Sequence, residues 1–291
     1  MLFYKERKLF TRVIYKNTNY MSKVILITGA SSGIGYDAVM RFLRKGHIVY
    51  AAARNVERME MLQSAGAYLI NMDLTNEESI KKGVEKVFSQ QGHIDVLVNN
   101  AGYGSFGAIE NVAIEEARRQ FEVNVFGLAR LIQLVLPSMR ERKMGRIINI
   151  SSMGGKFSEP FGGWYHATKY AIEGFSDSLR MELKPFGIKV ILIEPGCIAS
   201  EWSGIATKHL VESSIGTPYE ISCKNQAKNL TKIYKYASDA SVIGKTILKA
   251  STTKYPKIRY LKGFGAKGIV IFLKLIPTRW ADSIIIKLLF S

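Results

Sequence analysis

The sequence predicts an α/β fold, a doubly wound parallel sheet with helices on both faces, in a single domain with a C-terminal helical extension. Three observations favour this fold. Short apolar, β-branched runs alternate with longer amphipathic stretches over about residues 21–200. The runs are continuously apolar, which indicates strands buried on both faces. A glycine-rich turn separates the first strand from the first helix, and this alternation is typical of right-handed βαβ units.

Each element follows from its local pattern. The first strand is expected at 24–28, VILIT, and five more at 47–53, 67–72, 95–102, 145–151 and 189–196, the fourth running into a loop. Between them, apolar residues at helical spacing predict helices at about 34–46, 56–64, 76–90, 113–141 and 164–184. Gly46 is expected to cap the first helix. Beyond residue 200 the alternation fades, so we expect a substrate-covering lobe at about 200–240 and then late helices.

The net charge of +17 is unevenly distributed. Residues 1–20 hold five basic and one acidic residue, residues 21–223 hold 22 basic and 21 acidic, and residues 224–291 hold 14 basic and two acidic. We interpret 1–20 as a dispensable N-terminal extension, 21–253 as the domain and 254–291 as a basic, apolar helical tail. A nucleic-acid enzyme would carry its basic residues around its active groove, so we expect no nucleic-acid partner.

Cysteine usage and hydropathy bear on the compartment, on metal binding and on membrane contact. Cys197 and Cys223 are the only cysteines, and with no signal-peptide pattern both are expected to be reduced thiols in a cytoplasmic protein. No Cys/His cluster predicts a metal site. The apolar run at 268–276 is too short to span a bilayer. Three interpretations of the tail stay open: helices covering an apolar substrate cleft, a contact in a homodimer or homotetramer, or a peripheral contact with an anionic membrane surface.

The first turn carries the glycine pattern TGASSGIG, directly after a strand and opening a helix. Gly29 allows the tight turn, Gly33 lets backbone N–H groups approach a pyrophosphate, and Gly35 lets the helix pack closely on the strand. The helix N-terminus favours the anion. The pattern therefore predicts a Rossmann-type dinucleotide site. Its loop contacts are expected to be Gly29, Ser31, Ser32, Gly33, Ile34 and Gly35.

A second pattern lies at Tyr165 and Lys169, which share one face of a helix. A tyrosine, with a free pKa of about 10, is a poor acid–base at neutral pH unless positive charge stabilises its phenolate. Lys169 is therefore expected to lower the pKa of Tyr165. Ser152 comes thirteen residues earlier, at the end of a strand, where doubly wound sheets bind ligands. Its neighbour Ser151 is the competing candidate.

The three-glycine loop, the NNAG stretch at 99–102 and the Tyr165/Lys169 pair together resemble the short-chain dehydrogenase/reductase family. The resemblance covers about residues 21–200 and is looser beyond. It implies an oxidoreductase acting on CH–OH groups, with Tyr165 as general acid/base and Lys169 bonding the nicotinamide ribose. The family's usual spacing favours Ser152 as the residue that orients the substrate oxygen.

The resemblance also assigns supporting residues. Asn124 matches the family's asparagine in the proton relay to lysine, the alternative being an asparagine that bends its helix. His166 is interpreted as structural. The further cofactor contacts that it implies are Asp73, Leu74, Asn100, Ala101, Gly102, Pro195, Gly196, Ile198 and Ser200, where Ser200 replaces the usual threonine of a PGxxxT loop.

The second strand ends at Ala53, where NAD-binding sites often place a carboxylate, and Arg54 follows. A guanidinium can hold a 2′-phosphate in a fork, so NADP(H) is expected over NAD(H).

The sequence thus predicts an NADP(H)-dependent oxidoreductase that interconverts a lipophilic ketone or aldehyde and its alcohol. Its motifs and tail look like the branch related to 17β-hydroxysteroid and retinol dehydrogenases. A 3-oxoacyl thioester reductase is the alternative enzyme, and a non-catalytic NADP-sensing module is the alternative of another class. A sensor needs no proton donor, which argues against the last. Substrate contacts are expected within 103–110, 157–163 and 197–225.

Overall fold

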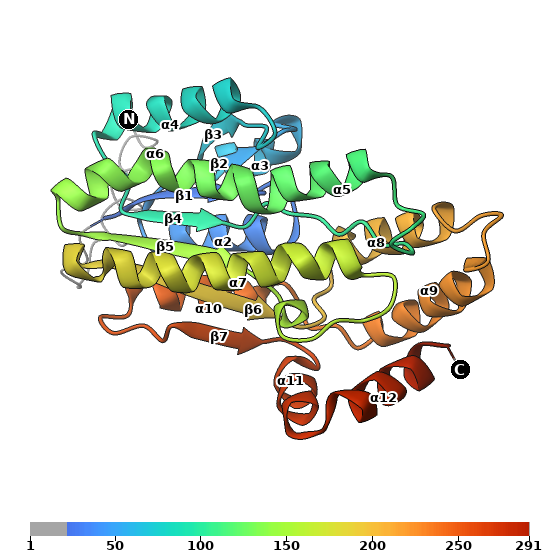
Figure 1. Ribbon diagram of the computed structural model, residues 1–291. Coiled ribbons are helices and arrows are strands. Elements are labelled where there is room, and N and C mark those ends of the chain that lie inside the picture. The colour runs from blue at the N-terminus through green and yellow to red at the C-terminus, as the bar shows by residue number, and fades with distance from the viewer. Residues whose placement is uncertain (1–21, 291) are drawn as a thin grey trace, which may run out of the picture.

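The structure, a computed structural model, describes residues 22–290 (Figure 1). The extension expected at 1–20 lies outside the described residues. A seven-stranded sheet runs through the domain in the order β3-β2-β1-β4-β5-β6-β7, and every neighbouring pair is parallel. This confirms the doubly wound α/β fold. The strands are β1 (Val24–Thr28), β2 (Ile48–Ala53), β3 (Tyr68–Asn71), β4 (Val96–Asn99), β5 (Gly145–Ile150), β6 (Ile188–Pro195) and β7 (Arg259–Lys262).

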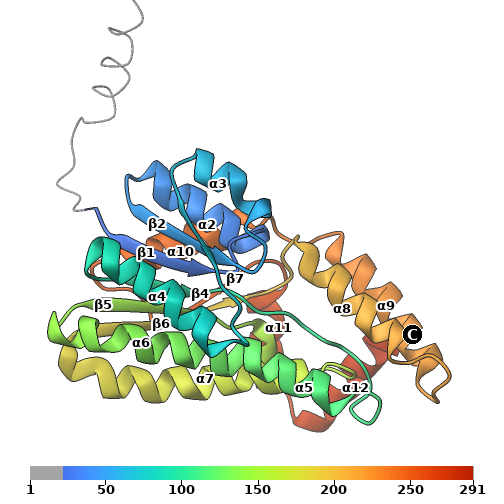
Figure 2. The same ribbon diagram turned by 90° about the horizontal axis from the view of Figure 1, so that it is seen from above.

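Helices cover both faces of the sheet, as Figure 2 shows from above. The first face carries α4 (Glu77–Gln91), α6 (Gly127–Glu141) and α7 (Gly163–Leu183), whose buried residues form one core cluster with the sheet. The second face carries α2 (Gly33–Arg44), α3 (Glu60–Ser64) and α10 (Ser241–Thr252), which form the other. Strand β1 is buried along its whole length, as the apolar run at 24–28 predicts. Both layers are therefore packed, and ligand access is left to the ends of the strands.

The order of the strands fixes where a ligand can bind. β1 pairs with β2 on one side and with β4 on the other, so the direction of chain progression reverses at β1. Doubly wound sheets bind ligands at such a switch point, beyond the carboxyl ends of the strands. In this protein the glycine loop and the NNAG stretch both lie there, directly after β1 and within and after β4.

The last strand was not predicted. The range 254–291 was expected to be helical, but β7 pairs with β6 and completes the sheet. Its Arg259 forms ion pairs with Glu173 and Asp177 of α7 and with Glu194 of β6. These charges hold a short, polar edge strand that has little apolar pattern of its own. A boundary at 253 therefore cuts through the sheet.

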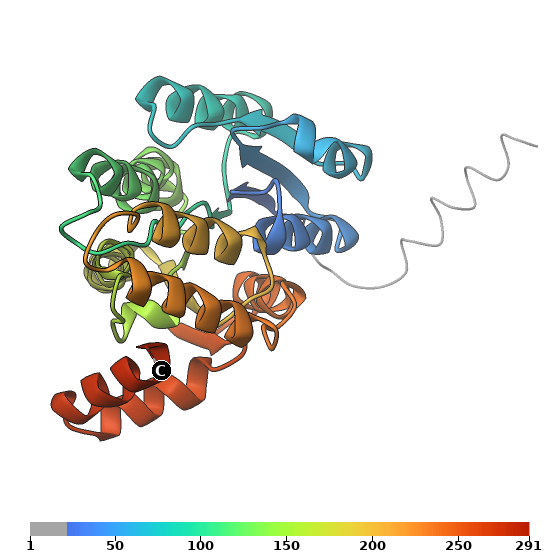
Figure 3. The ribbon, with the colours of Figure 1, turned by 90° about the vertical axis from the view of Figure 1, so that its right-hand side faces the viewer.

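Of the described helices that follow β6, α10 belongs to the second layer and four others lie outside both layers. They are α8 (Glu201–Glu212), α9 (Glu220–Tyr234), α11 (Ala266–Leu275) and α12 (Thr278–Phe290). Figure 3 shows α11 and α12 beside α9, at the carboxyl end of the sheet, and α12 packs against α9. The late helices expected from the sequence are thus present and cluster on one side of the molecule.

The helix expected at 113–141 is continuous but not uniform. It consists of α5 (Ile114–Phe121), a π-helical turn η2 (Glu122–Phe126) and α6. By length and composition, Ile114–Glu141 is the one helix among the described residues that could cross a membrane. Its apolar residues, however, include Leu128, Leu131 and Val135 of the core under the sheet. Packing against the sheet therefore accounts for part of its hydropathy.

Candidate active site

The glycine loop has the geometry that its spacing predicts. Gly29 and Gly33 adopt left-handed backbone angles, with φ of 65° and 52°. A Cβ at Gly35 would lie 2.2 Å from the carbonyl oxygen of Gly29, so only glycine allows α2 to start this close to β1. The loop therefore brings the first turn of α2 directly to the end of the strand.

A hydrogen-bond network fixes the loop to β4. The Asn100 side-chain amide donates to the carbonyl oxygens of Thr28 and Gly29, each at 3.0 Å. The Thr28 hydroxyl accepts from the backbone N–H groups of Asn100 and Ala101, each at 3.1 Å. Asn100 and Ala101 thus stabilise the loop from behind, in keeping with the wall expected at 100–102.

The start of α2 is suited to an anion. Its N-cap residue, Ser32, has extended backbone and makes no side-chain capping bond to the helix. The first N–H groups of a helix need an acceptor from outside the helix, and the helix dipole favours a negative one. The residues present therefore fit a pyrophosphate at this turn.

Two arginines lie beyond the end of β2. Arg54 follows the buried Ala53 and is exposed, and the side chain of Asn71 donates to its backbone carbonyl at 2.9 Å. Arg58, which was not predicted, pairs with Glu201 at the start of α8. Both arginines border the same cavity as the glycine loop. The part of the cavity beyond β2 is thus cationic, with Glu201 as the partner of one of the two arginines.

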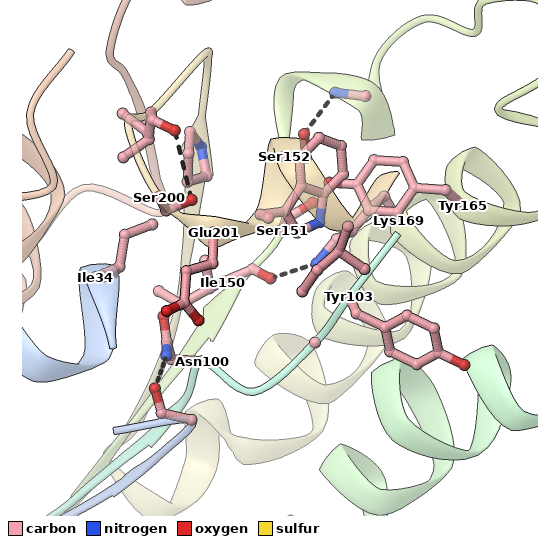
Figure 4. Close-up of a pocket in the computed structure, with 18 of the residues that line it drawn as sticks. Ile34, Asn100, Tyr103, Ile150, Ser151, Ser152, Tyr165, Lys169, Ser200 and Glu201 are labelled. Atoms are coloured by element: carbon pink, nitrogen blue, oxygen red, sulfur yellow. Dashed lines mark hydrogen bonds between the residues drawn. The ribbon is translucent and has the colours of Figure 1, made fainter. Parts of the chain in front are cut away.

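The acid–base residues meet at the other side of the loop (Figure 4). Tyr165 and Lys169 lie on the first turns of α7, both buried, with the Lys169 ammonium 5.7 Å from the centre of the Tyr165 ring. Lys169 donates to the carbonyl oxygen of Ile150 at the end of β5, at 3.0 Å. Ser152, two residues further, hydrogen-bonds Tyr165 and accepts from the N–H of Gly154 at 3.0 Å. The structure therefore brings Ser152, Tyr165 and Lys169 together.

Ser151, the competing candidate, does not contact Tyr165. Its hydroxyl is buried and would lie 3.1 Å from a Cβ at Gly155, and it has no hydrogen-bond partner among the described residues. Ser152, not Ser151, contacts Tyr165, which agrees with the choice made from the spacing.

The pKa of Tyr165 differs from the expectation. Burial raises it above its ordinary value, and the hydrogen bond from Ser152 lowers it in part. The expected lowering by Lys169 is not seen. Burial in turn lowers the pKa of Lys169 to about 8, and the nearby Glu173 partly opposes this shift. In this structure Tyr165 is therefore a protonated phenol at neutral pH, beside a lysine that loses its charge in mildly basic solution.

Asn124 lies in the π-helical turn η2, so it is both buried and at a distortion of its helix. Its side chain accepts from the N–H of Tyr103 at 3.1 Å and donates to the carbonyl oxygen of Tyr103 at 2.9 Å. It also donates to the Thr168 hydroxyl, next to Lys169, at 3.1 Å. A Cβ at Gly102 would lie 3.0 Å from the Asn124 oxygen and 3.9 Å from the Lys169 nitrogen. π-Helical turns are frequent at functional sites, and this one connects the wall behind the cofactor to α7.

The remaining predicted contacts lie around one cavity of about 650 Å³. Asp73 and Leu74 border it after β3, and Pro195, Gly196, Ile198 and Ser200 border it after β6. The Asp73 carboxylate accepts hydrogen bonds from Thr75. Ser200 is the residue before α8, and its Cβ lies close to the glycine loop, 3.3 Å from where a Cβ at Gly33 would be. His166 is structural as expected, because its Nε2 accepts from the N–H of Glu159 while its Nδ1 lies 2.8 Å from the carbonyl oxygen of Gly154.

The other end of the cavity is apolar and was predicted only in part. Trp202 of α8 packs on Tyr165, with ring centres 5.0 Å apart, and on Phe106, at 5.8 Å. The ranges 103–110, 157–163 and 197–225 all contribute, as expected. The late helices add residues that were not singled out, namely Leu230, Ile233, Tyr234, Ile269, Phe272, Leu273, Ile284, Ile285 and Leu288. The tail thus lines the cavity, as the first of its three interpretations expects.

A dinucleotide-type glycine loop after β1 and a Ser–Tyr–Lys group formed by the end of β5 and the start of α7 line one cavity and define a nicotinamide-dependent oxidoreductase. Comparison with known proteins gives the family. The model of the short chain dehydrogenase family matches residues 23–209. The chain belongs to the short-chain dehydrogenase/reductase family and is a dehydrogenase/reductase that acts on CH–OH or carbonyl groups.

Two curated relatives illustrate the likeness. The chain is 36% identical to a probable short-chain type dehydrogenase/reductase, VdlC, of Helicobacter pylori, over 89% of this chain and 95% of the relative. It is 44% identical to a 3-ketodihydrosphingosine reductase of Bacteroides thetaiotaomicron, over 60% of this chain and 63% of the relative.

Solved structures agree with the fold. A short-chain dehydrogenase from Streptomyces avermitilis, 32% identical, superposes with a TM-score of 0.76 and covers 91% of this chain and 98% of its own. A serine dehydrogenase in complex with NADP⁺, 27% identical, superposes with a TM-score of 0.70 over 82% of this chain and 94% of its own.

Proposed function

We propose that the protein is an NADP(H)-dependent carbonyl reductase whose substrate is a lipophilic ketone or aldehyde. One observation carries the proposal: a single cavity joins the glycine loop and the Ser152–Tyr165–Lys169 group to an apolar chamber lined by the late helices. The cofactor, when bound, supplies the hydride. The chain's residues bind the carbonyl, exclude water and supply the proton.

The roles of the three side chains follow from their positions. Ser152 and Tyr165 hydrogen-bond the substrate oxygen together, because their hydroxyls already contact each other. Tyr165 donates the proton as the carbonyl oxygen becomes an alcohol oxygen. The ammonium of Lys169, 5.7 Å from the centre of the Tyr165 ring, is the positive charge beside the tyrosinate that this leaves, and Asn124, bonded next to Lys169 through Thr168, belongs to the path that restores the proton.

Reduction is the direction that the structure favours. Because burial raises the pKa of Tyr165, the phenol carries its proton at neutral pH. A protonated donor is the form needed to reduce a carbonyl, whereas oxidation of an alcohol needs the phenolate.

Arg54 supports a preference for NADP(H). It borders the cavity beyond the end of β2, where the buried Ala53 offers no carboxylate to a ribose. Arg58 adds a second guanidinium, although its pairing with Glu201 offsets part of its charge. A 2′-phosphate would meet Arg54, which forms no ion pair within residues 22–290, and the serine dehydrogenase neighbour is complexed with NADP⁺.

The lining of the chamber supports a lipophilic substrate. Apolar side chains from α9, α11 and α12 form its far end, and apolar lining favours ligands with long hydrocarbon parts. The Bacteroides thetaiotaomicron relative is named a 3-ketodihydrosphingosine reductase, and a ketone with a long hydrocarbon part suits this chamber.

The test is a screen of NADPH oxidation with long-chain ketones, fatty aldehydes, ketosteroids, retinoids and 3-oxoacyl thioesters, repeated with NADH. We expect long-chain ketones or aldehydes to be reduced fastest and with NADPH. Turnover of thioesters alone would replace the proposal with 3-oxoacyl reduction. Tight NADPH binding with no turnover of any substrate would favour the sensing module instead.

A further inference from the structure

The consecutive helices α11 and α12, which we call the tail pair, carry many exposed apolar side chains. Figures 1 and 3 show both helices at the edge of the molecule, on the side where the chain ends. The exposed apolar members are Ile269, Ile271, Phe272, Leu275, Trp280, Ile286 and Leu288. Single exposed apolar residues are normal, whereas a group gathered on one part of the surface marks an interaction site. The tail pair is therefore a candidate docking surface.

Helix α11 is apolar on two opposite sides. Ala266 and Val270, one turn apart, are buried against the domain. Ile271 and Leu275 are also one turn apart and are 56% and 78% exposed, so they form a second apolar stripe that faces outward. A surface helix of a water-soluble protein normally has a polar outer side. Packing within the described residues therefore does not account for the outer stripe of α11.

The outer stripe ends at the connection between the two helices. Leu275 is the last residue of α11, and Trp280 lies in the first turn of α12 and is 66% exposed. Tryptophan combines a large apolar ring with one polar N–H group, and it is enriched where a membrane meets water. Leu275 and Trp280 thus form an exposed apolar tip.

Basic side chains lie around this apolar tip. Lys274 and Arg279 flank the connection, and Lys267 lies two turns before Lys274 on the same side of α11. All three are exposed and form no ion pair within residues 22–290. The tail pair holds four basic residues and one acidic residue, which gives it a net charge of +3. Its surface is therefore both apolar and positively charged.

An anionic lipid bilayer complements both properties of the tail pair. The apolar side chains leave water, and the basic groups meet the lipid phosphates while their stems lie along apolar surface. A second copy of the chain fits less well, because a symmetric contact would place the same positive charges against each other. The helices have ten and thirteen residues, fewer than the roughly 20 needed to cross a bilayer, so the contact lies on its surface.

We propose that the tail pair docks the protein on an anionic lipid bilayer. Leu275 and Trp280 enter the apolar zone just below the lipid headgroups. Lys267, Lys274 and Arg279 bind the lipid phosphates. This docking goes beyond the proposed function and does not depend on it.

The docking surface adjoins the apolar chamber. Phe272 and Leu288 line the cavity and are also exposed, and Leu273 and Ile285 of the same helices line it as well. A lipophilic ketone dissolved in the bilayer would therefore reach the chamber along the tail pair without crossing bulk water. This delivery of substrate, unlike the docking, rests on the proposed function.

Co-sedimentation with vesicles tests the docking. The vesicles consist of phosphatidylcholine alone, or of phosphatidylcholine and phosphatidylglycerol in equal parts, and the wild type should bind the anionic ones far more tightly. The charge variant, Lys267→Gln/Lys274→Gln/Arg279→Gln, should lose roughly 100-fold in affinity for them, since each basic residue near an anionic leaflet contributes about fivefold. The tip variant, Leu275→Ser/Trp280→Ser, should lose about tenfold or more.

Two matched controls keep the tail pair intact. Lys45→Gln/Lys82→Gln/Lys184→Gln removes the same charge from exposed lysines elsewhere, and Met61→Ser/Met181→Ser removes two similarly exposed apolar side chains. Both controls should bind like the wild type. Equal losses in the controls, or no binding of the wild type to anionic vesicles, would overturn the proposal. A tip variant that binds vesicles normally but turns a wild-type dimer into a monomer would assign the surface to a second copy instead.

Tryptophan fluorescence locates the contact. Trp280 is exposed, whereas Trp164 and Trp202 are partly buried and Trp202 packs on the ring of Tyr165. Adding anionic vesicles should shift the emission of the wild type to shorter wavelength and leave that of Trp280→Phe unchanged. The same shift in Trp280→Phe would place the contact elsewhere and overturn the assignment.

NADPH oxidation with a long-chain ketone, offered in detergent or in anionic vesicles, separates delivery from docking. Leu275 and Trp280 are not among the residues that line the cavity, so the tip variant should match the wild type in detergent and be slower with vesicles. Equal rates with vesicles would exclude delivery from the bilayer. Vesicle binding without reduction of the ketone would leave the docking standing and remove the proposed function, and reduction without vesicle binding would do the reverse.

Discussion

The two ends of the cavity are built in different ways. At the cofactor end, backbone groups make the site: the glycine loop, the first turn of α2 and the strand ends are held by bonds such as those from Asn100 to Thr28 and Gly29. At the substrate end, side chains make the site: Trp202 packs on Tyr165, and α9, α11 and α12 supply apolar groups. The cofactor end is therefore shaped by the backbone, whereas the substrate end is shaped by side chains that a substitution can change.

This difference predicts how the two ends respond to substitution. A change at the cofactor end must disturb backbone geometry or a specific charge, and its effects should be large. A change at the substrate end alters side-chain contacts and should shift selectivity more than stability. Tyr165 lies where the two ends meet, so it gives the sharpest test.

Tyr165→Phe should have the largest effect. It removes the proton donor and keeps the ring contacts with Trp202 and Phe106. We expect kcat to fall by roughly 10²–10⁴-fold, the usual contribution of a general acid, with NADPH affinity unchanged. Steady-state kinetics and NADPH fluorescence titration measure both. Activity within tenfold of the wild type would exclude Tyr165 as the donor, and a parallel loss of NADPH binding would mean that the variant disturbs the fold.

Gly35→Ala should damage the cofactor end through its backbone. The added Cβ would lie 2.2 Å from the Gly29 carbonyl oxygen and 2.7 Å from the Asn100 amide. Overpacking of this kind typically costs about 1–3 kcal/mol, and α2 must move away from the loop. We expect a lower free energy of unfolding and much weaker NADPH binding, measured by denaturant titration and by fluorescence. Unchanged NADPH affinity would show that the close approach of α2 to β1 is not needed for binding.

Arg54→Ala should weaken the binding of NADPH much more than the binding of NADH. Loss of one charge-assisted contact with a 2′-phosphate should weaken NADPH binding by roughly 10–30-fold. NADH lacks that phosphate and should bind nearly as before. Arg58→Ala is the companion variant, and we expect it to be milder because Arg58 already pairs with Glu201. Equal losses for NADPH and NADH in Arg54→Ala would argue against the predicted preference.

The pH profile tests Lys169. Its pKa of about 8 means that the ammonium is present below pH 8 and is lost as the pH rises further. If the charge stabilises tyrosinate, kcat/KM for reduction should fall above about pH 8, approaching one logarithmic unit per pH unit. Tyr165 does not titrate in this range, because burial raises its pKa. Lys169→Arg keeps its charge and should be flat from pH 8 to pH 9.5. A flat wild-type profile would contradict the proposed role.

Features that depend on neighbouring residues could be predicted from the sequence, whereas features that depend on contacts between distant segments could not. The glycine loop, the NNAG stretch and Tyr165/Lys169 are local patterns whose geometry follows from a few neighbouring residues, and the structure places them together. Arg58 forms an ion pair with Glu201, 143 residues away in the sequence, so no local pattern around Arg58 could predict this pair. The apolar lining that α9, α11 and α12 give to the substrate end likewise comes from segments far from the motifs along the chain.

Two features of the fold were missed for related reasons. Strand β7 reads RYLK and is held by ion pairs of Arg259 with α7 and β6, so its own sequence carries no continuous apolar run. The π-helical turn at Glu122–Phe126 changes the hydrogen-bond register of one turn and leaves the apolar spacing of the helix intact. Asn124 was the one visible signal of it.

Gly204→Ala gives the smallest expected effect and completes the comparison. Gly204 lies inside α8 at the substrate end, and a Cβ there would meet nothing within 4 Å. Alanine favours the helix over glycine by up to about 1 kcal/mol, so this variant should be slightly more stable than the wild type, with a Tm raised by roughly 1–3 °C. Its NADPH affinity should not change. The same chemical substitution would then destabilise one end of the cavity at Gly35 and stabilise the other. A loss of stability at Gly204 similar to that at Gly35 would show that α8 is held as rigidly as the glycine loop, and the two ends would not differ as proposed.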